Sequence, residues 1–204
     1  MSSGQRQGRW SGVPLPDRQS RRREELIAAG VTILGDEAEP ALTVRAVCRT
    51  AGMTERYFYE SFADRDEFVA AVYDQVCRTA MAELASSSTV LEAVQRFVTL
   101  MVDHPTRGRV LLIAPAKEPV LARSGAGWIG RFIELLQHTL FHDSDPQLRA
   151  MEATGLIGAL TALFTGYLSG TLAVSREQFV EHCVQLLVRE RQVVRYAGGL
   201  TAKT

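Results

Sequence analysis

The chain contains the stretch T43-V-R-A-V-C-R-T-A-G-M-T-E-R-Y-F-Y-E-S-F62, and this stretch decides the fold. Thr43 and Thr54 are residue types that cap the N-termini of helices, and Gly52 lies where a helix commonly ends in a left-handed conformation. Apolar residues recur at helical spacing in each half of the stretch. It therefore predicts two short helices joined by a glycine turn, which is the spacing of a helix-turn-helix motif.

Helical periodicity surrounds this motif on both sides. Upstream, apolar residues at helical spacing predict a first helix that begins near Arg18 and ends before a turn at 36–40. Downstream, Asp64 followed three residues later by Glu67 predicts the capped start of a longer helix. The serines at 86–88 interrupt the pattern and mark the start of a second helical region.

The second region is predicted to be helical throughout. The expected elements are a helix over 90–101, a short helix over 107–114, a stretch with a loop-like centre over 115–127, a helix from 128 to near His142, and helices over 153–174 and 179–196. Neither region has the alternating pattern of a strand, so the fold class is all-α. The expected organisation is a flexible basic leader (1–17), a helix-turn-helix domain (18–64), a helical effector-binding and dimerisation domain (65–197) and a flexible tail (198–204).

Composition limits the class of protein. The 204 residues are 46% apolar and have zero formal net charge, which indicates an ordinary soluble globular protein and argues against a disordered acidic or basic chain. The charge is uneven, because residues 1–23 hold six arginines and one acid. Three widely spaced cysteines, Cys48, Cys77 and Cys183, give no disulfide framework, so a reducing cytoplasm is expected. No motif for a cofactor or a catalytic group is present, so no enzymatic activity and no cofactor are predicted.

The stretch 43–62 and the following residues 64–68 resemble the tetracycline-repressor (TetR) family of bacterial regulators. The family's run is roughly T-x-x-x-I-A-x-x-A-G-V-S-x-x-x-x-Y-x-x-F, followed by a lysine and an apolar residue. The resemblance covers residues 20–75, and beyond them residues 103–107 are similar to a stretch common in the C-terminal domains of this family. Four departures keep the size or charge class of the family residue: Cys48, Met53, Thr54 and Arg65.

The resemblance implies a set of DNA contacts. Phosphate contacts fall on Thr43, Thr54, Tyr59 and Arg65, and contacts to base edges fall on Arg45, Glu55, Arg56 and Tyr57. The chemistry agrees, since hydroxyls and N–H groups at helix starts suit phosphate oxygens, and arginine can bind guanine through O6 and N7. The arginines at 21–23 either add phosphate or minor-groove contacts or form a solvated helix start.

The resemblance also implies a homodimer formed by the last two helices. Small residues recur every four positions from Gly158 to Gly170, which would let another helix approach closely, and the remaining apolar residues suggest that this helix is buried nearly all round. A two-fold pair would read a palindromic operator. The predicted interface residues are Gly158, Ala162, Gly166, Gly170, Phe179, Cys183, Leu186 and Leu187.

A small-molecule effector, apolar or aromatic, is the remaining expected partner. Its predicted pocket is lined by aromatic and flexible apolar residues with one histidine: Phe97, Met101, His104, Trp128, Phe132, Phe164 and Tyr167. Each of these residues fits a plain core position as well. The ligand would favour a conformation unable to bind DNA, and so would release a repressor from its operator.

Two other classes of protein, a membrane protein and a metal-binding protein, compete with this interpretation. The 22 uncharged residues at 153–174 are long enough to cross a bilayer, but they include four glycines and lack aromatic or basic anchors. A metal site is conceivable at His138 and His142 with Asp143 and Asp145, yet no further ligand motif completes it. The alternative hypothesis is therefore a helical ligand-binding or metal-binding protein without sequence-specific DNA binding.

Overall fold

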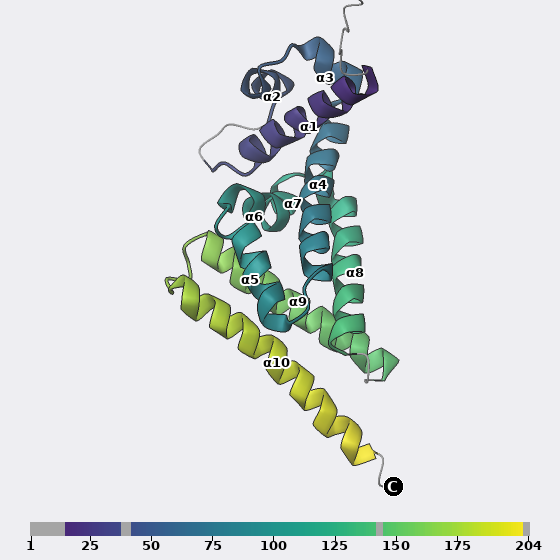
Figure 1. The fold of residues 1–204 in the computed structure, drawn as a ribbon, viewed down its shortest axis with the longest axis vertical. Coiled ribbons are helices and arrows are strands. Elements are labelled where there is room, and N and C mark those ends of the chain that lie inside the picture. The colour runs from purple at the N-terminus through teal and green to yellow at the C-terminus, as the bar shows by residue number, and fades with distance from the viewer. Residues whose placement is uncertain (1–14, 38–41, 142–144, 202–204) are drawn as a thin grey trace, which may run out of the picture.

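The computed structural model describes residues 15–37, 42–141 and 145–201 (Figure 1). The expected leader up to residue 14, part of the expected turn at 36–40, and His142 and Asp143 lie outside the described residues, as do 202–204 of the expected tail. The described part of the chain is helical and without strands, which confirms the all-α fold class. Its helices are α1 (Leu15–Leu34), α2 (Val44–Ala51), α3 (Glu55–Ser61), α4 (Arg65–Ala85), α5 (Val90–Met101), α6 (Pro105–Leu112), α7 (Ala114–Lys117), α8 (Leu121–Thr139), α9 (Pro146–Leu168) and α10 (Arg176–Thr201).

Helices α1, α2 and α3 form one end of the molecule, called here the head (Figure 1). Their apolar faces meet the first turns of α4 in a buried core around Leu26, Val47, Phe58 and Phe68. The rings of Phe58 and Phe68 lie 5.1 Å apart, within the range of favourable aromatic pairs. This common core therefore holds the helices of the head together.

Helix α4 leaves the head and runs into the rest of the molecule, called here the body, where α8 lies beside it (Figure 1). Asp64 caps α4 by accepting a hydrogen bond from the backbone N–H of Glu67 (2.8 Å), as the sequence pattern predicted. In the body, α5 packs on α4 and α10, and α9 packs on α8 and α6. Met101, Leu121 and Phe141 of the body are fully buried.

Several helices differ from the sequence prediction in their bounds. Helix α1 begins at Leu15, inside the predicted leader, and α10 runs to Thr201, inside the predicted tail. The short helix predicted over 107–114 is α6, at Pro105–Leu112. Helix α8 begins at Leu121, inside the stretch 115–127 that was expected to be loop-like at its centre. Helix α9 begins at Pro146, where the Asp145 carboxylate accepts a hydrogen bond from the backbone N–H of Gln147 (2.9 Å). It ends at Leu168, before the uncharged run ends. Absence of charge therefore did not mark either end of this helix, whereas the cap and proline mark its beginning.

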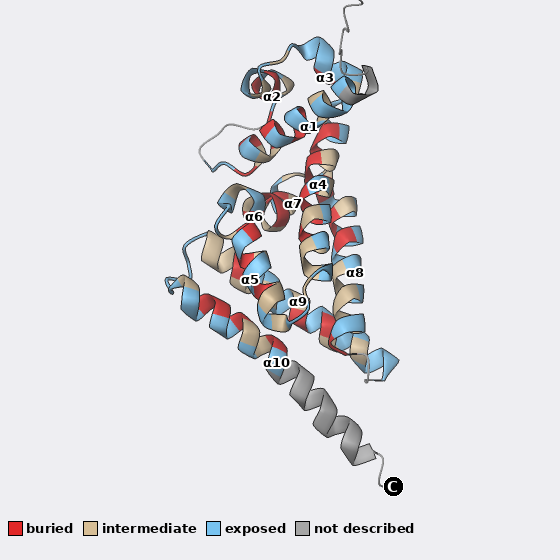
Figure 2. Cartoon of the chain, in the orientation of Figure 1, coloured by how far each residue is buried: buried red, intermediate tan, exposed pale blue. Residues whose placement is uncertain are grey.

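The prediction that α9 is buried nearly all round is wrong for the protomer. Its buried residues are Ala153, Leu156 and Phe164, and much of its surface is exposed or half-buried (Figure 2). Gly170 was expected on the small-residue stripe of this helix, but it lies in the following turn with a φ of 72°. The stripe consequently ends at Gly166.

Candidate nucleic-acid interface and ligand cavity

Helix α2 is held by the capping that its sequence predicts, whereas the predicted cap of α3 makes no side-chain hydrogen bond. The Thr43 hydroxyl accepts a hydrogen bond from the backbone N–H of Ala46 (3.2 Å), and a hydroxyl that accepts in this way keeps its hydrogen for another acceptor. At the other end of α2, Gly52 has a φ of 65° and the N–H of Met53 donates to Cys48 (2.8 Å). Thr54 is exposed and makes no side-chain cap bond to α3. Both threonine hydroxyls therefore have hydrogen-bonding capacity left.

One face of α3 packs into the head and the other is open to solvent. Phe58 is fully buried, whereas Tyr57 and Tyr59 are 38% and 56% exposed. Arg56 and, on α2, Arg45 extend away from the protein, with side chains 84% and 90% exposed. The residues predicted to face bases thus share one accessible surface with Tyr59, called here the reading surface.

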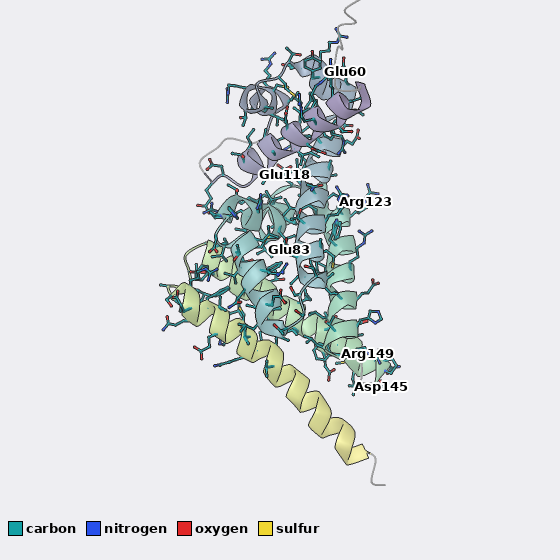
Figure 3. The ribbon with its side chains drawn as sticks, viewed as in Figure 1. Glu60, Glu83, Glu118, Arg123, Asp145 and Arg149 are labelled. Atoms are coloured by element: carbon teal, nitrogen blue, oxygen red, sulfur yellow. The ribbon has the colours of Figure 1, made fainter. Side chains whose placement is uncertain are left out.

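Ion pairs organise the charges of the reading surface. Arg45 and Glu55 join α2 to α3 through an Nε to Oε1 contact of 3.3 Å, so two residues that were predicted separately form one pair. Arg56 donates from Nε to Glu60 (2.9 Å) within α3. Figure 3 labels Glu60 on α3 in the head. Pairs this exposed are weak, so both arginines can exchange the carboxylate for another partner at little cost.

Helix α1 also contributes to this surface. The Arg22 guanidinium stacks over the Tyr57 ring at 4.4 Å and lies 3.5 Å from Glu60. The next residue, Arg23, stacks over the Phe62 ring at 4.8 Å. The sequence marked these arginines as basic residues, but it gave no sign that they would lie against α3, since that contact depends on how α1 crosses the motif.

Arg65, for which a phosphate contact is predicted, is bound by acceptors of the protein itself. Its Nε donates to the backbone carbonyl of Leu42 (2.8 Å), and its Nη2 donates to the Glu118 carboxylate (2.8 Å), which lies between head and body in Figure 3. Its Nη1 lies 3.3 Å from Asp66. These acceptors, chiefly the bond to Glu118, raise the pKa of Arg65. The guanidinium therefore connects the head to the α7–α8 turn.

A cavity of about 730 Å³ lies in the body between α4, α5, α8, α9 and α10. Its size is within the usual range for small-molecule sites. Of the residues predicted to line a pocket, four line this cavity: Phe97, Trp128, Phe132 and Phe164. The other three do not: Met101 is fully buried in the core, His104 is exposed at the start of α6, and Tyr167 packs on Phe179 with ring centroids 4.4 Å apart.

Sequence reasoning missed much of the cavity wall. Tyr73 of α4 lines it, with a hydroxyl 3.7 Å from where a Cβ on Gly125 would lie. Burial, with a hydrogen bond to Cys77, raises the pKa of Tyr73, so the phenol stays neutral. Cys183 also lines the cavity, and burial raises its pKa to about 11, which keeps its thiol protonated near neutral pH. The sequence predicted α4 only as a longer helix, because periodicity does not distinguish core from cavity wall.

The predicted interface residues divide into two groups. Phe179, Cys183 and Leu187 are buried within the protomer, and the last two line the cavity, because α10 packs against α5 and α9 of its own chain. Leu186 is half-buried. In contrast, Gly158 and Ala162 are exposed and lie in a shallow, mainly apolar groove with Ile133, Ile157, Thr161 and Gly166.

Two observations concern the metal-binding and membrane hypotheses. The described residues include no group of three or more His, Cys, Asp and Glu side chains that could bind a metal ion. Helix α9 is long and apolar enough to cross a membrane, with a mean hydropathy of 1.2, by length and composition only.

The arrangement is an all-helical body with a helix-turn-helix head, and solved structures share it. No family model matches the sequence, and no curated protein matches it significantly. A TetR-like transcriptional regulator from Rhodococcus sp. RHA1 is 19% identical over 87% of this chain and 97% of its own, with a TM-score of 0.65. The fatty acid degradation regulator FadR from Bacillus halodurans is 14% identical over 81% and 94%, with a TM-score of 0.60. The multidrug binding protein EbrR, solved with imidazole, is 19% identical over 81% and 94%, with a TM-score of 0.59. The chain therefore has the fold of TetR-family transcriptional regulators.

Proposed function

We propose that the protein is a cytoplasmic TetR-type transcriptional regulator that binds a palindromic DNA operator as a homodimer. It acts as a repressor and is released by a small apolar ligand held in the cavity of the body. The observation that carries the proposal is the reading surface, where the outward residues of α2 and α3 are exposed while Phe58 anchors α3 from behind.

The chemistry of the reading surface supports DNA as the partner. Thr43, Thr54 and Tyr59 offer hydroxyls to phosphates at the edges of the motif. Arg45 and Arg56 can each bind a guanine, with Glu55 accepting from a cytosine amine, and each good bidentate contact contributes about 1–3 kcal/mol of discrimination. Arg65 is left out of this set, because its guanidinium is directed to Leu42 and Glu118. Arg22 replaces it as a cation beside α3.

The groove on α9 supports a homodimer. A Cβ atom added at Gly158 would have no neighbouring atom within 4 Å, so the protomer itself does not require a glycine there. Large apolar side chains next to this face, Ile129, Leu148 and Met151, are exposed in the protomer by 50%, 54% and 71%. Burying such side chains against a second copy would be favourable, and the two-fold pair would present two reading surfaces to one duplex. The names of two structural neighbours, a fatty acid degradation regulator and a multidrug binding protein, are consistent with an apolar ligand.

The test is selection of bound sequences from random DNA, followed by gel-shift titration. We expect a palindrome with half-sites about one helical turn apart, and binding that weakens steeply with salt. Arg56→Ala should weaken operator binding by ten- to a hundredfold and relax the preferred sequence, and Tyr59→Ala should weaken all sequences alike. Arg78→Ala removes an exposed arginine of α4 in the body and should leave operator affinity unchanged. If no sequence is selected at any salt concentration, the alternative class of helical ligand-binding protein is favoured.

A further inference from the structure

The wall of the cavity restricts the charge of its ligand. Of the described residues that line it, none is acidic, basic or histidine. Two charges beside Trp128 are directed elsewhere. Asp74 accepts the indole N–H of Trp128 (2.7 Å), and Arg131 stacks over the Trp128 ring at 4.5 Å without lining the cavity. A charged group inside would lose its hydration without gaining an opposite charge, and this strongly disfavours it.

The polar side chains of the wall gather mainly at one end. The α4–α5 turn and the C-terminal end of α8 lie away from the head (Figure 1). Ser87, Ser88 and Thr89 of the wall belong to this turn, and Thr139 is the last residue of α8. Tyr73, Pro115 and Gly125 of the wall precede these segments in α4, α7 and α8. Along α4, Tyr73 and Leu84 are eleven residues apart, which corresponds to about 16 Å at 1.5 Å per residue. The cavity is therefore elongated, with an apolar interior and a hydroxyl-rich end.

Toward a ligand, three of the four hydroxyls at this end act as acceptors, whereas Thr89 accepts from the backbone N–H of Glu92 (3.1 Å) and keeps its hydrogen. Ser87 donates to the carbonyl of Glu83 (2.8 Å), Ser88 donates to the Glu92 carboxylate (2.7 Å), and Thr139 donates to the carbonyl of Leu135 (2.8 Å). A hydroxyl whose hydrogen is engaged offers a ligand its lone pairs. A ligand group that can donate, such as a hydroxyl, is the complement of these side chains.

The α4–α5 turn also opposes a negative charge. Glu92 accepts hydrogen bonds from Ser88, through both its backbone N–H and its hydroxyl, and these bonds lower the pKa of Glu92 to about 2. Glu92 is therefore ionised at any ordinary pH. Glu83 lies in the same region (Figure 3), and Arg96 pairs with both carboxylates, so two negative charges face one positive charge. A carboxylate ligand whose head stayed in water at this end would still meet a net negative charge.

From this wall we infer that the ligand is an elongated, uncharged apolar molecule with a hydroxyl group, bound with the hydroxyl at the Ser87–Thr89 end. The inference rests on the proposed ligand cavity, and it adds the charge and polarity of the molecule. It excludes fatty carboxylates and lipophilic ammonium ions as the preferred class.

The test compares three probes of equal chain length on the full-length protein without DNA, so that it does not depend on operator binding. Dodecanol, dodecanoate and dodecylammonium are titrated below their micelle-forming concentrations, and the fluorescence of Trp128 in the cavity wall reports binding, with Trp10→Phe as the background to remove the other tryptophan. Dodecanol should bind at least tenfold more tightly than either ion. Equal or tighter binding of an ion, or no binding of any probe, would overturn the inference.

A charge variant tests the hydroxyl end separately. Glu92→Gln should strengthen dodecanoate binding several-fold and leave dodecanol binding within about twofold, since only the anion meets the Glu92 charge. Glu24→Gln, which removes an exposed acid of α1 in the head, should change neither affinity. If Glu92→Gln leaves the ratio of the two affinities unchanged, the ligand does not place its polar end at this turn. Loss of operator selection with these affinities intact would instead contradict the proposed function and not this inference.

Discussion

Arg65 shows how one side chain takes a role that its position in a motif does not reveal. Its place after the helix-turn-helix suggested a phosphate contact, and the residue type suits one. In the structure the guanidinium also contacts Glu118, which is 53 residues away in sequence and has a side chain that is only 15% exposed. Local sequence carries no information about a partner so distant, so this contact could not be predicted.

Glu118→Gln is therefore expected to destabilise the folded protein by about 1 kcal/mol, because it removes the charge from a short and partly buried hydrogen bond, discounted for the partial exposure of Arg65. Urea unfolding of the two proteins measures the difference. Asp66→Asn is the matched control, since Asp66 approaches the same guanidinium at 3.3 Å with a side chain that is 65% exposed. If both variants lower the free energy of unfolding equally, the contact from Arg65 to Glu118 contributes no more than the exposed contact to Asp66.

Asp103 and Arg176 form a bidentate ion pair, with Nε to Oδ1 at 3.0 Å and Nη2 to Oδ2 at 2.9 Å. The arginine lowers the pKa of Asp103 below its ordinary value of 3.8. A lowered folded-state pKa means that the stabilisation is present above that ordinary value and is lost as the pH falls through the folded-state pKa.

Asp103→Asn should therefore lower the free energy of unfolding at pH 7 by no more than about 1 kcal/mol, because the pair is exposed, and so lower the thermal midpoint slightly. The difference from the original protein should shrink as the pH falls below 3.8. Thermal scans followed by circular dichroism over a series of pH values test this. A difference that stays constant with pH would show that the charge of Asp103 does not matter.

At the scale of elements, the sequence predicted helices well wherever a cap and an apolar stripe coincide. This holds for α2 and α4, whose caps at Thr43 and Asp64 are observed, whereas α3 forms without a side-chain cap bond from Thr54. It failed at Leu121, because glycines and a serine in the first turns of α8 resemble a loop, although tertiary packing on α4 makes the segment helical. The sequence prediction was also incomplete for the cavity. Met101 and Phe97 lie on one helix, but Phe97 lines the cavity and Met101 is buried in the core.

The turn between α2 and α3 gives a prediction at this scale. Gly52 has a φ of 65° and no atom within 4 Å of an added Cβ, so a substitution there meets a conformational cost without a steric clash. Gly52→Ala should destabilise the protein by about 1–2 kcal/mol, and Gly52→Asn should cost less, because asparagine enters the left-handed region more readily. Chemical denaturation of the two variants gives the comparison. Equal costs would mean that the backbone conformation is not the cause.

At the scale of the whole molecule, the exposed face of α9 is the feature that a single protomer leaves unexplained. The sequence marked this helix as apolar and rich in small residues, but it could not separate burial inside the chain from burial against a partner. The structure places Phe179, Cys183 and Leu187 inside the protomer and leaves Gly158 and Ala162 exposed.

If this face forms the proposed dimer, Gly158→Arg should yield a folded monomer, because the added side chain is free in the protomer and clashes only with a second copy. Sedimentation velocity should show half the mass of the original protein, and operator binding should weaken with it. Gly127→Arg, at an exposed glycine of α8 where an added Cβ also meets no atom within 4 Å, is the control and should remain dimeric. A Gly158→Arg protein that keeps the dimer mass would place the interface elsewhere.

The position of Arg65 between head and body has one more consequence. A guanidinium occupied by Leu42, Asp66 and Glu118 cannot turn to a phosphate without leaving the Glu118 carboxylate, which is largely shielded from water, without its cation. Nucleic acid and the α7–α8 turn would then compete for the same three nitrogens. Pro115 and Leu121, on either side of Glu118, also line the cavity. A ligand that orders the α7–α8 turn would therefore strengthen the contact between Glu118 and Arg65, and would oppose binding of Arg65 to a phosphate.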